Sequence, residues 1–178
     1  MNNQHTLQNW LDGGAVQRFH QWEMLDRQSV AAHTFNMLLI AEYTYKHELG
    51  DKLMRELTQA ILFHDLAEGR RGVSDVSAWA KWEFPNLDQA VKAAEKVVEH
   101  RMGFPTYELT PTQHHRLKFC DYVELMYTVL RERKLGNTIL FNASWPVITD
   151  KMNKEVDAMS LPEVAIFNWV RGEGFKYE

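Results

Sequence analysis

The chain has 178 residues and a formal net charge of −4, and 45% of its residues are hydrophobic and 25% charged. This length suits one domain with a proper core, and the composition excludes a disordered chain. The lack of a dense Lys/Arg stripe argues against binding to duplex nucleic acid, and the single cysteine, Cys120, excludes an intramolecular disulfide or a zinc site built from several thiolates.

Apolar residues recur at spacings of three and four along most of the chain, which predicts an all-α fold. In the first half, Ser29 can cap a helix to about Gly50, and Asp51 can cap another that ends around Gly69. Two segments precede them: a short amphipathic turn carrying Leu7, Trp10 and Leu11 that stops at Gly13-Gly14, where glycine tolerates the left-handed conformation, and an irregular connection over residues 15 to 28.

The second half is divided by glycines, prolines and capping residues. Thr110-Pro111 predicts a helix start by two rules at once, a hydroxyl cap followed by proline in the first turn. The expected segments are a loop over 70 to 75, a short helix to Phe84 with a break at Pro85, a helix from Asn86 or Asp88 to Gly103, one from Thr110 to Gly136, one near 138 to 158 bent at Pro146, and a last one opened by Ser160 and Pro162.

The chain shows no sign of export or membrane insertion. No stretch approaches the ~20 apolar residues that span a bilayer, and the start of the sequence, Met1 to His5, lacks the basic and apolar regions of a signal peptide. We therefore expect a protein of the reducing cytoplasm that has no membrane partner.

The dipeptide His64-Asp65, which closes an apolar run, carries the main indication of chemistry. His33 lies upstream on a second predicted helix, and Asp121 lies downstream on a third. Imidazole nitrogens with carboxylate oxygens suit Mn, Fe, Co, Ni or Zn better than calcium, which prefers oxygen ligands. Such an ion lowers the pKa of water toward ~7 and polarises phosphoryl oxygens, so the pattern predicts metal-dependent hydrolysis.

Other polar residues near these positions can assist. Glu68 follows Asp65 by three residues and Asp75 lies on the next predicted loop, so either can orient water or protonate a leaving oxygen. Arg18 can hold phosphate oxygens bidentately. Three further residues are candidates for contacting substrate: Phe19, beside Arg18, as a flat surface for a base, His20 as a lining residue, and Lys81, after the Asp75 loop, as a second cation.

In order and context these residues resemble the HD-domain phosphohydrolases, in particular the compact branch with bacterial 5'-deoxynucleotidases and phage dATP triphosphohydrolases. The matching pieces are Arg18-Phe19, Ser29 to His33, His64 to Glu68, and Lys118 to Asp121. The resemblance covers about residues 15 to 140. It implies one globular helical HD domain over 1 to 178, with the metal-site core in 15 to 140 and the C-terminal helices, 138 to 178, packed on it.

The resemblance also implies roles. Its metal ligands correspond to His33, His64, Asp65 and Asp121, and its glutamate corresponds to Glu68. Two positions depart from the family pattern. Val73 stands where an acid is expected, so Asp75 and Lys81 match only with two inserted residues, and Ala32 replaces the usual glutamate before the first histidine.

The expected activity is hydrolysis of 2'-deoxynucleotides by a homo-oligomer, in the host cytoplasm if the chain is phage-encoded. The context Arg18-Phe19-His20 favours a dATP-type triphosphohydrolase, which releases deoxynucleoside and triphosphate, because the bacterial enzymes carry Arg-Trp-Pro. Two alternatives stay open: a 5'-deoxynucleotidase that releases phosphate from a monophosphate, and a catalytically silent nucleotide sensor.

Overall fold

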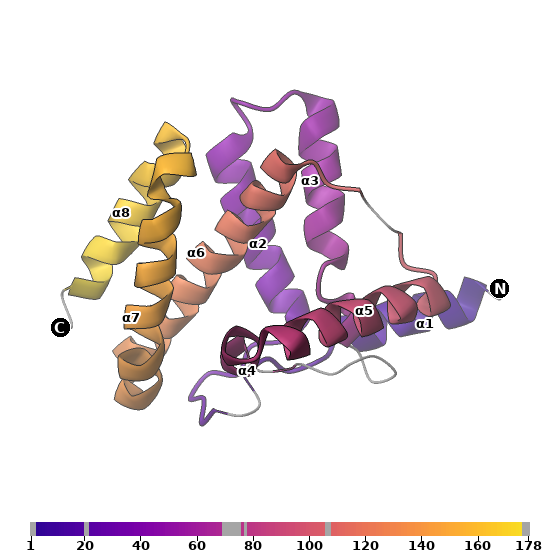
Figure 1. Ribbon diagram of the computed structural model, residues 1–178, viewed down its shortest axis with the longest axis horizontal. Helices are drawn as coiled ribbons and strands as arrows, with labels where there is room; N and C mark the ends of the chain where they lie inside the picture. The colour runs from indigo at the N-terminus through magenta and orange to yellow at the C-terminus, as the bar shows by residue number, and fades with distance from the viewer. Residues whose placement is uncertain (1–2, 20–21, 69–75, 77, 106–107, 176–178) are drawn as a thin grey trace. The chain divides into compact units, whose positions relative to one another are not determined.

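The computed structural model describes residues 3–19, 22–68, 76, 78–105 and 108–175. These ranges are helical and contain no strand, apart from an isolated antiparallel bridge between Gln17 and Ser29. The predicted all-α class is therefore confirmed (Figure 1). The elements are α1 (Asn3–Gly14), α2 (Val30–Tyr45), α3 (Asp51–Phe63), η1 (Leu66–Glu68), α4 (Ala78–Glu83), α5 (Pro85–Met102), α6 (Pro111–Leu135), α7 (Thr138–Glu155), η2 (Val156–Ala158) and α8 (Leu161–Phe175).

Several helix ends follow from local capping. The Ser29 hydroxyl accepts from Ala32 N at 3.2 Å at the start of α2. At the start of α6, Thr110 and Gln113 form a reciprocal capping box. Gly103 and Gly136 end α5 and α6 in the left-handed conformation, with φ of 71° and 108°.

Other ends differ from the prediction. Helix α2 ends at Tyr45 rather than near Gly50, and α3 ends at Phe63, so that a separate 3-10 turn, η1, carries the residues up to Glu68. Helix α5 begins at Pro85 itself, because proline in the first turn lacks only an N–H that has no helical partner there. Helix α1 ends at Gly14, as predicted, although neither Gly13 nor Gly14 is among the described glycines with positive φ.

The chain divides into two compact units. The first contains residues 1–22, 27–35 and 59–108, and the second contains 23–26, 36–58 and 109–178. Helices α2 and α3 each contribute to both units. A single domain over the whole chain stays a prediction.

The core of the first unit lies around η1, which contacts both α1 and α5. Trp10 meets Phe63 edge to face at 4.9 Å between ring centroids, and Phe104 lies beside both rings. The buried residues of this cluster are Val30, Leu66, Ala67, Val98, Met102 and Phe104. The turn that follows His64-Asp65 is therefore fixed by apolar packing on both sides.

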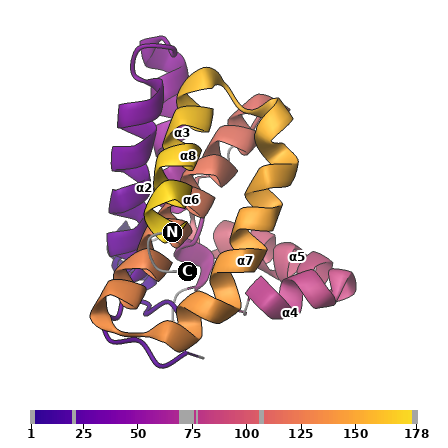
Figure 2. The ribbon, with the colours of Figure 1, turned by 90° about the vertical axis from the view of Figure 1, so that its left-hand side faces the viewer.

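The second unit is built on the long helix α6, against which α7 and α8 pack (Figure 2). Trp145 is almost fully buried and stacks on Phe141 at 5.3 Å. Gly174 lies so close to the Trp145 ring that an added Cβ would stand 1.9 Å from Cζ2. The end of α8 therefore requires glycine for close packing.

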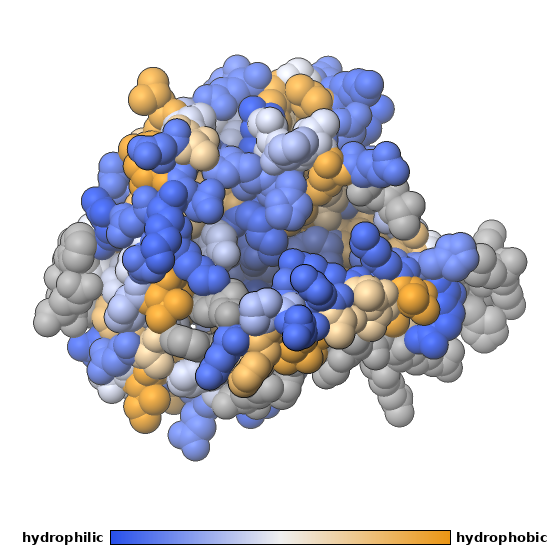
Figure 3. All heavy atoms as spheres, viewed as in Figure 1, coloured by the Kyte–Doolittle hydropathy of each residue, from blue (hydrophilic) through white to orange (hydrophobic). Residues whose placement is uncertain are grey.

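The surface mixes hydrophilic and hydrophobic side chains. On the face shown in Figure 3, hydrophobic groups are separated by hydrophilic ones. The most exposed large apolar side chains include Leu161 and Tyr43, at 87% and 78%. Within the described residues, no helix is both long and apolar enough to cross a membrane.

Buried Glu132 on α6 fastens the segment 23–26 within the second unit. Its carboxylate accepts from the backbone N–H groups of Leu25 and Asp26 at 2.9 and 2.8 Å, and from the side-chain amide of Asn137 at 2.8 Å. Arg131, the neighbouring residue on α6, pairs with the Asp26 carboxylate. One buried acid thus satisfies two donors of a distant segment and one donor just beyond its own helix.

We predict that Glu132→Ala lowers the free energy of unfolding by about 3 kcal/mol, because three donors lose their buried acceptor. Chemical denaturation measures this loss. The exposed residue Glu48 provides the control, since Glu48→Ala should change the free energy by less than about 0.5 kcal/mol. An equal effect of the two substitutions would contradict the role of Glu132.

Candidate metal centre

Two elements of the first unit bring His33, His64 and Asp65 together. His33 lies in the first turn of α2, and its backbone N–H donates to Ser29 O at 3.0 Å. His64 and Asp65 lie between the end of α3 and the start of η1. The early end of α3 thus places both side chains on a connection rather than along a helix face.

Both imidazoles face one carboxylate oxygen. Asp65 Oδ2 lies 3.6 Å from His33 Nε2 and 3.2 Å from His64 Nε2. The two rings are 5.4 Å apart between centroids, and the His33 side chain is fully buried. Three of the four predicted ligands are therefore grouped within one unit.

The tautomer of His64 follows from its second nitrogen. Nδ1 lies 2.7 Å from Ile61 O. A carbonyl oxygen can only accept a hydrogen bond, so Nδ1 carries a proton, and Nε2 is the nitrogen that faces Asp65 and can bind a metal. This is the arrangement in which a histidine binds a metal through Nε2 while a backbone carbonyl orients the ring.

Positive groups around Asp65 determine its charge state. Burial by itself raises the pKa of Asp65, but the imidazoles of His64 and His33, and then the Arg18 guanidinium, lower that pKa below its usual value. The carboxylate is consequently ionised at neutral pH. An ionised acid is the form that can coordinate a cation.

Arg18 is placed by a short antiparallel pairing. Val30 N donates to Val16 O at 2.8 Å, and Arg18 N donates to the carbonyl of Gln28 at 2.9 Å. The amide oxygen of buried Gln28 also lies 3.4 Å from Arg18 Nη1. The connection over 15 to 28 therefore carries defined pairing that orients Arg18.

Phe19, the next residue, has an unusual backbone. Its φ of 57° makes it the only described non-glycine residue with positive φ, a conformation that costs about 1 kcal/mol or more for a bulky residue. The Arg18 guanidinium carbon lies 5.2 Å from the centre of the Phe19 ring, a cation–π distance. Together these features fix both side chains in one local turn.

The other predicted residues lie on further elements. Glu68 lies in η1, is buried, and donates its backbone N–H to Asp65 O at 3.1 Å. Lys81 lies half-buried on α4. Asp121 lies on α6 in the second unit, where its carboxylate pairs with Lys118 Nζ at 3.0 Å. His20 and Asp75 lie outside the described residues.

The three residues of the first unit fit a divalent transition metal. Ligands held 2.0–2.1 Å from a tetrahedral ion stand about 3.3 Å apart, close to the 3.2 and 3.6 Å between Asp65 Oδ2 and the two Nε2 atoms. The donors are two imidazoles and an ionised carboxylate, a set that several first-row metals accept. These three residues therefore suit every ion expected from the sequence and do not distinguish one ion from another.

No family model matches the chain, nor does any curated protein or solved structure. The candidate centre is therefore supported by the chain's own residues and their geometry alone.

Sequence reasoning missed two residues that shape the centre. Gln28 holds Arg18, but a glutamine in a connection gives no signal of a partner ten residues away. Gly13 permits close approach: a Cβ added there would stand 2.7 Å from the backbone oxygen of Leu66 in η1. The adjacent pair Gly13-Gly14 was the available signal, and it indicated a helix end rather than a contact.

We predict that Gly13→Ala destabilises the first unit, because a backbone oxygen cannot move aside as a flexible side chain can. The expected loss is about 1–3 kcal/mol, typical of an overpacked site. The matched control is Gly14→Ala, whose Cβ meets Ala31 Cβ at an ordinary 3.4 Å, and which should be neutral or slightly stabilising in a helix. Thermal denaturation of both variants gives the comparison, and equal stabilities would contradict the close approach.

Proposed function

We propose that this protein is a metal-dependent phosphohydrolase of 2'-deoxynucleotides. The observation that carries the proposal is the convergence of His33 and His64 on the ionised carboxylate of Asp65 beside Arg18. We assign Asp121 as the fourth ligand on the resemblance of the sequence to HD-domain phosphohydrolases.

In the proposed reaction, a bound divalent ion supplies Lewis acidity toward the phosphate and acidifies water. Arg18 binds phosphate oxygens with its planar guanidinium and neutralises their charge. Phe19 offers its ring to the base, with His20 and Lys81 as further contacts. Glu68 and Asp75 are the candidates to orient the attacking water or to protonate the leaving oxygen.

Among the possible substrates we favour dATP, cut to deoxyadenosine and triphosphate. The support is the local sequence. Arg18-Phe19-His20 resembles the phage dATP triphosphohydrolases more than the bacterial 5'-deoxynucleotidases, which carry Arg-Trp-Pro there. The Arg18-Phe19 turn with positive φ is compatible with a pre-formed contact surface. We further propose that the chain acts in the cytoplasm, that of the host if phage-encoded, as a homo-oligomer without duplex nucleic acid as a partner.

The direct test is to incubate the protein with Mn²⁺, Co²⁺, Zn²⁺, Fe²⁺ or Ni²⁺ and then with dATP or dAMP, and to identify the products by chromatography. We expect deoxyadenosine and triphosphate from dATP. Phosphate from dAMP alone would establish a 5'-deoxynucleotidase instead. Nucleotide binding without product under every metal would establish a silent sensor.

The metal assignment predicts that Asp65→Asn lowers bound metal at least tenfold and abolishes turnover, because the centre loses its anionic ligand. Asp121→Asn should act in the same way. Elemental analysis of the purified protein measures the metal directly. Asp150→Asn is the matched control, because Asp150 on α7 also pairs with a lysine, Lys154, in an exposed position. Full metal content in both Asp65→Asn and Asp121→Asn would refute the centre.

A further inference from the structure

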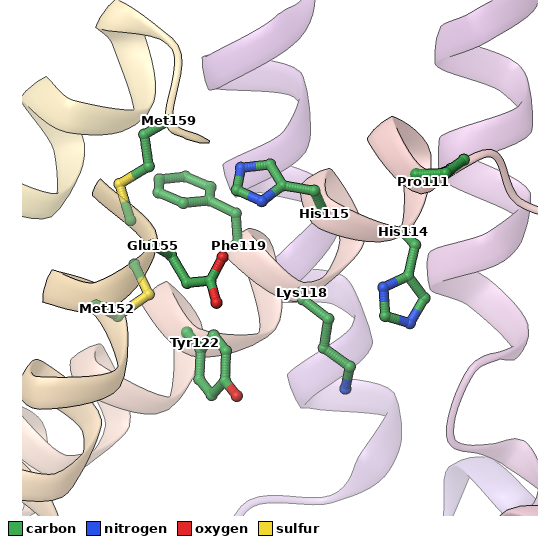
Figure 4. Close-up of a pocket in the computed structure, with 9 residues that line it drawn as sticks. All are labelled: Pro111, His114, His115, Lys118, Phe119, Tyr122, Met152, Glu155 and Met159. Atoms are coloured by element: carbon green, nitrogen blue, oxygen red, sulfur yellow. The ribbon is translucent and has the colours of Figure 1, made fainter. Parts of the chain in front are cut away.

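A pocket in the second unit lies between α6 and the end of α7 with the turn after it (Figure 4). Its volume is about 240 Å³. Pockets for drug-sized ligands have about 300–1,000 Å³. A ligand that fills this one is therefore the size of a single substituted ring.

The floor and walls of the pocket are apolar. Phe119 on α6 and Met152 on α7 are almost fully buried, and Tyr122 and Met159 complete the wall. Two thioethers beside two aromatic rings form a polarisable surface on which a flat ring packs well. This part of the pocket favours an aromatic ligand.

Three basic side chains of α6, His114, His115 and Lys118, line the same pocket. In Figure 4 the His115 ring lies beside Phe119, whereas His114 and Lys118 extend from α6 in another direction. Lys118 also pairs with Asp121 at 3.0 Å. His115 is therefore the basic side chain beside the aromatic wall, and it favours a negatively charged substituent there.

The His115 ring is held from outside the pocket by a buried acid. Its Nε2 lies 3.5 Å from Glu163 Oε1, and the Glu163 side chain is 3% exposed. Glu163 in turn accepts from Tyr45 OH at 2.5 Å and from Ser160 N at 2.6 Å. Residues of α2, α6 and α8 thus fix one edge of the imidazole and leave Nδ1 as its remaining polar atom.

An acceptor and a donor complete the polar lining. The Glu155 carboxylate, on the last turn of α7, points toward the residues of α6 in Figure 4. Burial raises the pKa of Tyr122, so its phenol is neutral and keeps its O–H at physiological pH. A ligand that carries only negative charge would face repulsion from Glu155, whereas one with an N–H or O–H group would donate to it.

We propose that this pocket is a binding site for a small aromatic acid that also carries an amine or a hydroxyl group. Its ring packs on Phe119 and Met152. Its carboxylate lies against His115, and its donor reaches Glu155. The site lies in the second unit, and the four residues assigned to hold the ligand, Phe119, Met152, His115 and Glu155, are not among those proposed for catalysis or metal binding.

The test uses 4-aminobenzoate as the probe, with benzoate, aniline and inorganic phosphate as comparisons, and calorimetry or NMR titration as the readout. No metal or nucleotide is added, so the result does not depend on the phosphohydrolase proposal. We expect saturable binding of 4-aminobenzoate with a Kd below about 1 mM. Benzoate, which lacks the donor, and aniline, which lacks the acid, should each bind about fivefold to tenfold more weakly.

Two variants locate the binding. Glu155→Gln should reduce the preference for 4-aminobenzoate over benzoate to less than twofold, and His115→Gln should weaken both acids about fivefold or more. The matched control His47→Gln changes an exposed histidine of the same unit and should leave every affinity unchanged. Because Glu155 is exposed, its variant remains informative even if His115→Gln perturbs the packing.

Three results would overturn the proposal. The first is no saturable binding of 4-aminobenzoate to the intact chain. The second is binding of phosphate as tight as that of 4-aminobenzoate, which would indicate a plain anion site. The third is binding that neither Glu155→Gln nor His115→Gln alters, which would place the probe elsewhere.

Discussion

The contact of the Asp65 carboxylate with two imidazoles is the interaction on which the candidate centre depends. The Asp65 side chain is partly buried, and removing a carboxylate from water is costly unless positive groups or donors compensate it. Here His64 and His33 lie within 3.6 Å of one of its oxygens, and Arg18 adds a further charge that favours the ionised form. The chain therefore maintains a negative charge at a place where two nitrogen lone pairs can also be presented.

This contact requires a specific local backbone. Helix α3 ends at Phe63, and η1 then enters the apolar cluster through Leu66 and Ala67. Because η1 lies against α1, where Gly13 allows backbone approach, the connection that carries His64-Asp65 is held from both of its ends. The position of the acid thus depends on packing as much as on its own hydrogen bonds.

The features that the sequence predicts well are local. The Thr110-Pro111 start and the glycine ends at Gly103 and Gly136 each depend on residues within one helical turn, and the structure has all three. The end of α3 was predicted about six residues too late. That end depends on the packing of η1 against α1 and α5, which no local pattern contains.

Long-range partners were beyond prediction for the same reason. The Glu132 carboxylate binds Leu25 and Asp26, more than 100 residues away in sequence. Within the site, the grouping of His33, His64 and Asp65 was predicted because histidine and aspartate are typical metal ligands. The role of Gln28 was not predicted, because a glutamine side chain does not by itself indicate a particular function.

Two buried acids of the second unit, Glu124 and Glu132, differ from Asp65 in the groups that compensate them. In the second unit, Glu124 accepts from Asn36 and Thr128, both neutral, and Glu132 accepts from backbone N–H groups and an amide. Neutral donors satisfy a carboxylate without presenting any group for further chemistry, as expected of structural ties. Asp65 instead faces two imidazoles, whose nitrogens can exchange a proton for a metal ion. Of these three acids, Asp65 alone has surroundings that suit coordination, which is why we place the chemistry there.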